Sequence, residues 1–172
     1  MKIMKQLLLA PFTILFILLI NTPLNATHVS GGNIEYECIG PNQFQITLRL
    51  FEDCSGSATL GNNEDIDITS NCGFNQTLTL NRIGPASEIS QLCATALPNS
   101  SCSGGGLPGM LEYIYQATIT FPVGCDSLQL AYSVADRNSS NNISNSLNEE
   151  FSVVATLDNS IPCPNNSPTF SY

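Results

Sequence analysis

Seven cysteines carry most of the reactive side-chain chemistry in this sequence: Cys38, Cys54, Cys72, Cys93, Cys102, Cys125 and Cys163. None of them forms a C-x2-C pair, and His28 is the only histidine, so the set does not suit a structural zinc site. In an exported chain, which meets oxidising conditions, the same residues are expected to form disulfides. Because seven is odd, at least one thiol stays free or pairs with another chain.

No catalytic constellation stands out among the remaining residues. Hydrolases of the Ser-His-Asp or Cys-His kind need a histidine beside the nucleophile, whereas His28 lies at the expected mature N-terminus. The glycines at 104–106 lack the lysine and the strand–loop–helix context of a phosphate site. Three carboxylate pairs have the residue types of a glycosidase, but neighbours on a strand face opposite sides, so we expect solvated turns at Glu52-Asp53, Glu64-Asp65 and Glu149-Glu150. The sequence predicts a protein that is not an enzyme, with no catalytic or cofactor-binding residues.

Calcium is the cation that the loop residues suit best, because it prefers carboxylate and amide oxygens. Residues 62–65 (Asn-Asn-Glu-Asp) and 136–142 are the candidate loops. Neither has the spacing of an EF-hand, so no residue is assigned as a metal ligand. A glycan-binding face usually exposes aromatic rings, but the chain has no tryptophan and most of its five tyrosines fall in strand patterns. A glycan- or calcium-binding extracellular module is therefore the alternative to a structural role.

The first 26 residues have the layout of a secretory signal peptide. Lys2 and Lys5 precede an apolar run over residues 7–20, and a short polar stretch leads to the small residue Ala26. The run is shorter than the roughly 20 residues that a membrane-spanning helix needs. We expect cleavage after Ala26 and a mature chain that starts at Thr27, is secreted or displayed at the cell surface, and does not insert into the membrane. An uncleaved membrane anchor is the alternative.

Few positive charges remain once the signal is removed. Lys2 and Lys5 leave with it, so three arginines face 14 acidic residues and the formal charge changes from −9 to −11. Nucleic acids bind clustered lysine and arginine, which displace counterions, so this class of partner is excluded. Anionic membrane surfaces are disfavoured for the same reason. The partners left are other domains, surface proteins and glycans.

The apolar residues of the mature chain alternate with polar ones, as half-buried strands do. Seven runs of this kind are predicted strands: 33–38, 43–51, 64–70, 76–82, 112–121, 127–134 and 150–157. Turn residues at 40–42 (Gly-Pro-Asn) predict a hairpin of the first two strands, and those at 122–124 (Pro-Val-Gly) predict a hairpin of the fifth and sixth. The pattern predicts an all-β fold, an immunoglobulin-like antiparallel β-sandwich of about seven strands that contains disulfides.

Three stretches break the alternation. Residues 93–110 are rich in Ser, Gly and Pro, and this long loop is either cross-linked or mobile. We expect a disulfide between Cys93 and Cys102 to close its first half, which contributes about 2–3 kcal/mol. Residues 136–149 form an Asn- and Ser-rich connection. Residues 162–172 are predicted to be a linker or the start of a following segment, so the β-sandwich domain is expected over residues 27–161.

Several short motifs occur together along the mature chain. They are Thr27-His28-Val29-Ser30-Gly31-Gly32, strands that end at Cys38 and at Glu52-Asp53-Cys54, and the segments 112–118 (EYIYQAT), 137–138 with 143–145, and 162–168 (PCPNNSP). This combination resembles the N-terminal region of large secreted surface proteins of Bacteroidetes, of the gliding-motility-associated type. The resemblance implies a non-catalytic, surface-associated module with a structural or adhesive role. Such proteins continue into further domains, so the chain is expected to be a fragment or a truncated relative.

The same resemblance bears on the cysteines. Where the family has two adjacent cysteines, this chain has Ala135 and Asp136. If those cysteines bridge to earlier strands, the resemblance implies that their partners are unpaired here, and Cys38 and Cys54 are the candidates. These two are not expected to pair with each other. A turn near Pro41 puts Cys54 far past the other end of the hairpin, and a disulfide needs Cα atoms within about 7 Å.

Overall fold

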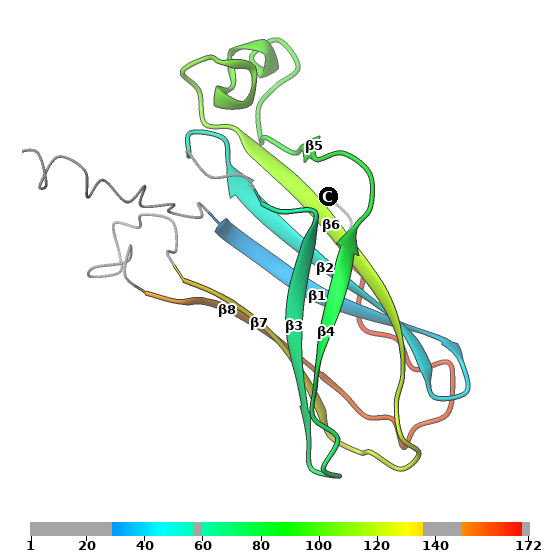
Figure 1. Ribbon diagram of the computed structural model, residues 1–172. Helices are drawn as coiled ribbons and strands as arrows, with labels where there is room; N and C mark the ends of the chain where they lie inside the picture. The colour runs from blue at the N-terminus through cyan, green and yellow to red at the C-terminus, as the bar shows by residue number, and fades with distance from the viewer. Residues whose placement is uncertain (1–28, 57–59, 136–148, 170–172) are drawn as a thin grey trace, which may run out of the picture.

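The fold is built almost entirely from antiparallel β-strands. The computed structural model describes residues 29–56, 60–135 and 149–169 (Figure 1). The elements are β1 (Val29–Gly40), β2 (Gln43–Asp53), β3 (Asn63–Ser70), β4 (Gln76–Arg82), β5 (Ser87–Glu88), the 3-10 turns η1 (Leu97–Asn99) and η2 (Ser101–Ser103), β6 (Met110–Thr120), β7 (Leu128–Val134) and β8 (Phe151–Leu157). All seven predicted strands are present, which confirms that the alternation reports strands. The two-residue β5 is an addition.

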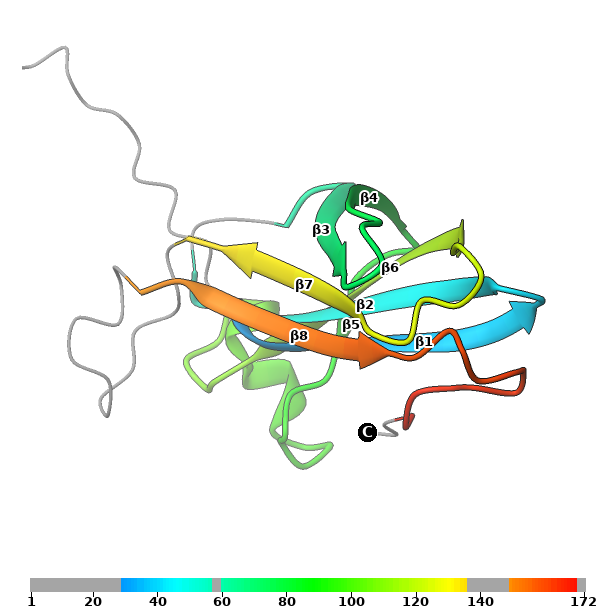
Figure 2. The same ribbon diagram turned by 90° about the horizontal axis from the view of Figure 1, so that it is seen from below.

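The strands form one sheet that folds back on itself. Their order is β1-β2-β6-β4-β3-β7-β8, with β5 beside β6. Figure 2 shows β1, β2 and β6 in one layer and β3, β7 and β8 in the other. β4 joins the layers because it pairs with β3 and also, through Asn81 and Arg82, with β6. The all-β antiparallel architecture is confirmed, and the assignment to the immunoglobulin-like type stays a prediction.

The core lies between the two layers and consists of the apolar members of each alternating run. On β2, Phe44, Ile46, Leu48 and Leu50 are at most 1% exposed. Inward residues of the other strands complete the core: Ile66, Ile68, Leu80, Tyr113, Tyr115, Leu128, Leu130, Tyr132 and Leu157. Full burial of a side chain of this size stabilises the fold by roughly 1.5–3 kcal/mol. Most polar members of these runs therefore face outward, where they can build surface sites.

The first predicted hairpin is confirmed and the second is wrong. β1 and β2 pair around a turn in which Asn42 adopts a φ of 57°, a conformation that asparagine tolerates better than most residues. By contrast, β6 pairs with β2, β4 and β5, whereas β7 pairs with β3 and β8. β2 pairs with β6 along its whole length, and β4 and β5 pair with part of its other side. The turn at 122–124 therefore leads the chain into the other layer.

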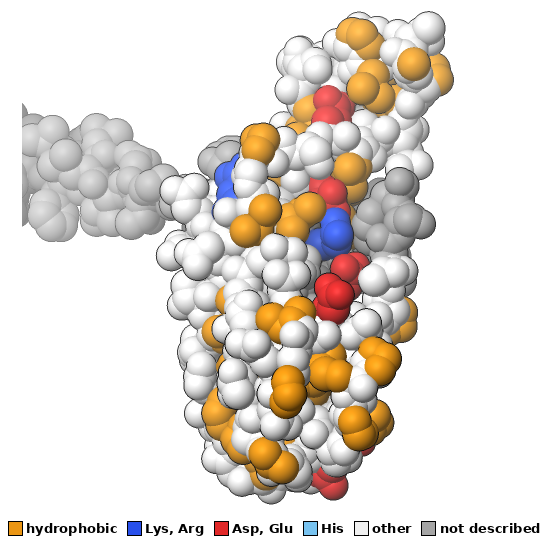
Figure 3. Space-filling view, turned by 90° about the vertical axis from the view of Figure 1, so that its right-hand side faces the viewer, with side chains coloured by type: hydrophobic (Ala, Val, Ile, Leu, Met, Phe, Trp, Pro, Cys, Tyr) orange, Lys and Arg blue, Asp and Glu red, His pale blue; other side chains and the backbone are white. Residues whose placement is uncertain are grey.

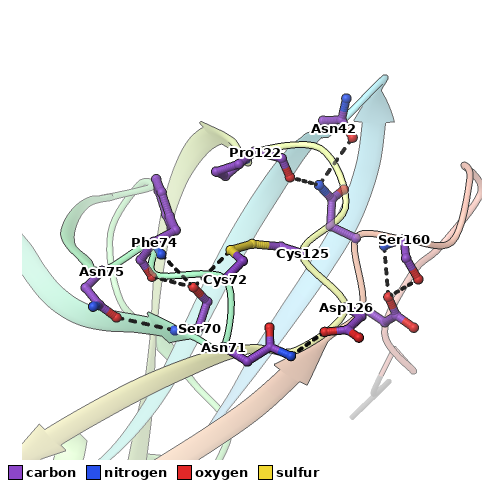
Figure 4. The surroundings of a disulfide bond; sticks show 12 residues. Asn42, Ser70, Asn71, Cys72, Phe74, Asn75, Pro122, Cys125, Asp126 and Ser160 are labelled. Atoms are coloured by element: carbon purple, nitrogen blue, oxygen red, sulfur yellow. Dashed lines mark hydrogen bonds between the residues drawn. A yellow bond between two sulfur atoms is a disulfide. The ribbon is translucent and has the colours of Figure 1, made fainter.

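Three disulfides join segments that are distant in the sequence: Cys38–Cys163, Cys54–Cys102 and Cys72–Cys125 (the last in Figure 4). The expected Cys93–Cys102 bridge is therefore wrong, and so is the expectation that Cys38 and Cys54 are unpaired. Cys93 is the free, exposed thiol. The long loop folds back over the end of β2, where the Cys54 amide donates to the Gly109 carbonyl (3.0 Å), and this contact brings Cys102 to Cys54.

The segment after β8 is bound to the domain, although a linker was expected there. Cys163 is bonded to Cys38, and the side-chain oxygen of Asn166 accepts a hydrogen bond from the Cys38 amide (2.8 Å). Ser167 exchanges two further hydrogen bonds with Tyr36. We call residues 162–169 the tail. The packed unit therefore extends beyond residue 161, and the tail covers part of the free edge of β1.

Several expectations fall on residues outside the described ranges. The signal peptide 1–26, the mature N-terminus at Thr27, His28 and the candidate calcium loop at 136–142 are among them. Within the described residues, no helix has the length and apolar character required to cross a membrane.

Candidate binding surfaces

A polar cluster lies inside the sandwich, near the end of β2 and the start of β3. Its members are Glu52, Glu64, Arg82, Tyr113, Tyr115 and Tyr132. The solvated turns expected at Glu52 and Glu64 are therefore wrong. Glu52 is only 5% exposed, and Glu64 accepts a hydrogen bond from the Tyr132 hydroxyl (3.1 Å). Both residues occupy positions of their strands that face the interior. The residue type alone, a charged glutamate, does not indicate this.

The electrostatics of this cluster indicate a structural role. The Arg82 guanidinium lies over the Tyr113 ring, 4.4 Å from its centroid. Burial, followed by the nearby Glu52 carboxylate, raises the pKa of Tyr113 to about 12. Burial also raises the pKa of Glu64, although hydrogen bonds from Tyr132 and Gly61 oppose this change. The hydrogen bond from Tyr132 and the nearby Arg82 cation reduce the cost of placing carboxylates in the interior, while Glu52 Oε2 is buried without a hydrogen-bond partner among the described residues.

The other carboxylates of the candidate pairs lie at the surface or in turns. Asp53 accepts hydrogen bonds from the amide and the hydroxyl of Ser55. Asp65 accepts one from the Thr79 hydroxyl (2.6 Å) on the outer face of β3 and β4. Glu149 and Glu150 are exposed. Among the described residues, no three His, Cys, Asp or Glu side chains gather as ligands for a metal ion.

One hollow is an apolar groove at the end of the sandwich where β1 turns into β2. It has a volume of about 630 Å³ and is lined by residues 38–42, Phe44, Val123, Gly124 and residues 159–163. We call it the end groove. Three large apolar side chains at this end are exposed, namely Ile39 (48%), Val123 (85%) and Ile161 (50%). Exposed apolar side chains that border a hollow are typical of an interaction site.

One buried asparagine holds the walls of the end groove together. The Asn159 side-chain amide donates to the Pro122 carbonyl (2.8 Å) and to the Asn42 side chain (3.2 Å), both of which are labelled in Figure 4. Its backbone amide donates to the Cys125 carbonyl (2.8 Å). Asn159 is 6% exposed. It therefore connects the β1–β2 turn, the β6–β7 connection and the segment after β8.

A second, polar hollow lies between the tail and the outer face of β1, β2 and β6. Its volume is about 310 Å³, and its lining is Glu35, Tyr36, Glu37, Gln45, Thr47, Arg49, Gln116, Asn166, Ser167 and Thr169. We call it the tail cleft. Acidic and basic side chains adjoin one another on one face of the molecule in Figure 3. Because Glu35 and Thr47 are each only 8% exposed, the floor of this cleft is unusually buried for the outer face of a sheet.

An ion-pair ladder holds one side of the tail cleft. Arg49 Nη1 donates to Glu112 Oε1 (2.8 Å), and Arg49 Nε lies 3.4 Å from Glu35 Oε1. The Asn33 side chain donates to the same Glu35 oxygen (2.8 Å). Burial lowers the pKa of Arg49 and is the largest single effect. The hydrogen bonds and charges of Glu112 and Glu35 together outweigh it, so the pKa is raised. The guanidinium therefore keeps its positive charge and is held in one orientation, and the two neighbouring carboxylates balance that charge.

The free thiol lies away from both hollows, on the long loop. Cys93 is exposed, and its sulfur lies 3.4 Å from the Thr95 hydroxyl. That hydrogen bond, followed by one from the Ala96 amide, lowers the pKa of the thiol. The thiol is thus accessible to reagents.

Sequence reasoning did not identify either hollow. The floor of the tail cleft consists of polar residues from three predicted strands, and they line a cleft only because the tail lies over them. The sequence signal for the position of the tail was Cys163, together with Asn165, Asn166 and Ser167 shortly after it. No protein-family model matches the chain, and no curated protein or solved structure is significantly similar to it.

Proposed function

We propose that this chain is an exported, non-catalytic β-sandwich module with a structural or adhesive role at the cell surface. The observation that carries the proposal is the set of three disulfides, which tie the tail, the long loop and the β6–β7 connection to the sheet. Disulfides of this density form and persist outside the reducing cytoplasm. The resemblance of the sequence to leading domains of gliding-motility-associated proteins of Bacteroidetes supports the same role.

The test uses cells of the organism that produces the protein. Antibody labelling of intact cells should detect the chain at the surface, and alkylation before reduction should leave six cysteines protected. A deletion strain should adhere less to glass or to neighbouring cells, and the restored gene should recover adhesion. Recovery of a reduced protein from the cytoplasm, or unchanged adhesion and surface organisation after deletion, would contradict the proposal.

A glycan- or calcium-binding extracellular module is the second candidate, and the tail cleft is the observation that favours it. Calcium and glycan are separable by two measurements on the exported protein. A bound calcium ion raises the melting temperature in calcium relative to EGTA, because a ligand that binds only the folded state stabilises it. A glycan array reports sugar binding directly.

A further inference from the structure

We propose that the tail cleft binds a neutral sugar residue of a glycan. This inference rests on the second candidate function, a glycan-binding module, and assigns it a place and a ligand class. The place is the hollow bounded by the outer faces of β1, β2 and β6 on one side and by the tail on the other.

The floor of the cleft is polar because it uses the outward members of three alternating strands. Thr47 of β2 lies opposite Glu35 of β1 and Gln116 of β6. The Gln116 side-chain amide donates to the Thr47 hydroxyl (3.1 Å). Thr47 therefore keeps its own proton to donate. Such side chains are not needed for the core, which lies on the opposite face of the same strands.

The floor of the cleft suits a neutral ligand because its charges are already paired with one another. Arg49 is the only cation among the lining residues, and Glu35 and Glu112 already neutralise it. An anionic ligand would have to compete with these two carboxylates for the guanidinium. A cationic ligand would find Glu35 engaged by Arg49 and Asn33, which leaves Glu37 at the exposed margin. The floor therefore offers no unpaired charged group to either an anionic or a cationic ligand.

The remaining groups match sugar hydroxyls, which donate and accept hydrogen bonds. Three amides and three hydroxyls line the cleft: Gln45, Gln116, Asn166, Thr47, Ser167 and Thr169. Each of these amides and hydroxyls can likewise donate and accept hydrogen bonds. The volume of about 310 Å³ is at the lower end of the range for small-molecule sites, which suits one or two sugar rings.

The roof of the cleft is held in position before any ligand binds. The Cys38–Cys163 disulfide anchors the start of the tail. The hydrogen bonds of Asn166 and Ser167 to the backbone of β1 then fix the part that covers the floor. A site that is already ordered loses less conformational entropy on binding, which favours affinity for small ligands.

The experiment uses the exported chain on an array of neutral, acidic and amino-sugar glycans, followed by titration of the strongest hit. We expect a neutral glycan to bind. Gln116→Ala and Thr47→Val should each weaken binding roughly tenfold, which is the loss expected for one or two hydrogen bonds. Gln76→Ala, a glutamine substitution at an exposed position at the start of β4, is the matched control and should bind as the unchanged chain does. Near-ultraviolet circular dichroism confirms that each variant is folded.

Three results would overturn the inference. Binding of acidic or amino sugars alone would reject the neutral ligand class. Binding that persists in both folded cleft variants would place the glycan site elsewhere and leave the glycan-binding function standing. Failure of every glycan to bind would reject both the cleft assignment and the glycan-binding function. The structural or adhesive role would be unaffected, because cell labelling and the deletion strain test it separately.

Discussion

The backbone amide of Ser167 donates to the carbonyl of Tyr36 (2.9 Å), and the Tyr36 amide donates to the hydroxyl of Ser167 (2.9 Å). The tail thereby occupies backbone groups of β1 on the side away from β2. Unpaired groups on an edge strand are a template for pairing with other chains. The tail is therefore both a wall of the tail cleft and a cover for an exposed edge.

Replacement of Ser167 by alanine removes the acceptor of the Tyr36 amide. We expect the free energy of unfolding in urea to fall by about 1 kcal/mol, which is the usual net loss for one hydrogen bond. Ser152→Ala changes an exposed serine on β8 and should leave stability unchanged. Equal effects of the two substitutions would show that the tail contact contributes nothing.

The Cys38–Cys163 bridge closes the longest loop of the three, with a sequence separation of 125 residues. The double variant Cys38→Ala/Cys163→Ala should lose about 2–4 kcal/mol of stability, because the unfolded chain gains freedom. Cys93→Ala removes the free thiol and is the matched control, for which we expect little change. Urea denaturation of both variants under non-reducing conditions provides the comparison, and a similar loss in the two would reject this disulfide map.

The sequence predicted the strands better than it predicted their partners. The alternation of residues 44–50 is a local property, so it identifies β2 and its buried face without knowledge of the rest of the fold. The partner of β6 depends instead on which edges are already occupied, and this information is spread over the whole chain. The turn residues at 122–124 therefore correctly predicted that the chain reverses direction there. The prediction that the strands on either side pair with each other was wrong.

The cysteines show the same limit. An odd count does require one cysteine without an internal partner, and Cys93 is that residue. The pairing itself depends on where the long loop and the tail dock, and neither position follows from spacing along the chain. The short distance between Cys93 and Cys102 in the sequence favoured a local bridge, whereas the fold brings Cys102 to Cys54, 48 residues away.

Asn159 should be the most sensitive polar residue of the end groove. Asn159→Ala leaves the Pro122 carbonyl and the Asn42 side chain without a buried donor, so we expect a loss of about 1–3 kcal/mol. Asn63→Ala, at an exposed position at the start of β3, is the control. Thermal unfolding compares the two variants. An unchanged melting temperature for Asn159→Ala would show that the three segments do not depend on this side chain.

Glu64 should make stability depend on pH in the weakly acidic range. Burial raises its pKa in the folded state above the ordinary value of 4.5, so the folded protein holds this proton more tightly than the unfolded chain. The corresponding stability is present below pH 4.5 and is lost as the pH rises through the raised folded pKa. Glu64→Gln keeps an acceptor for the Tyr132 hydroxyl and has no proton to lose, so its stability relative to the unchanged chain should increase over that window. Urea denaturation at a series of pH values measures the difference. A difference that stays constant with pH, or that has the opposite sign, would show that Glu64 is not desolvated in the folded protein.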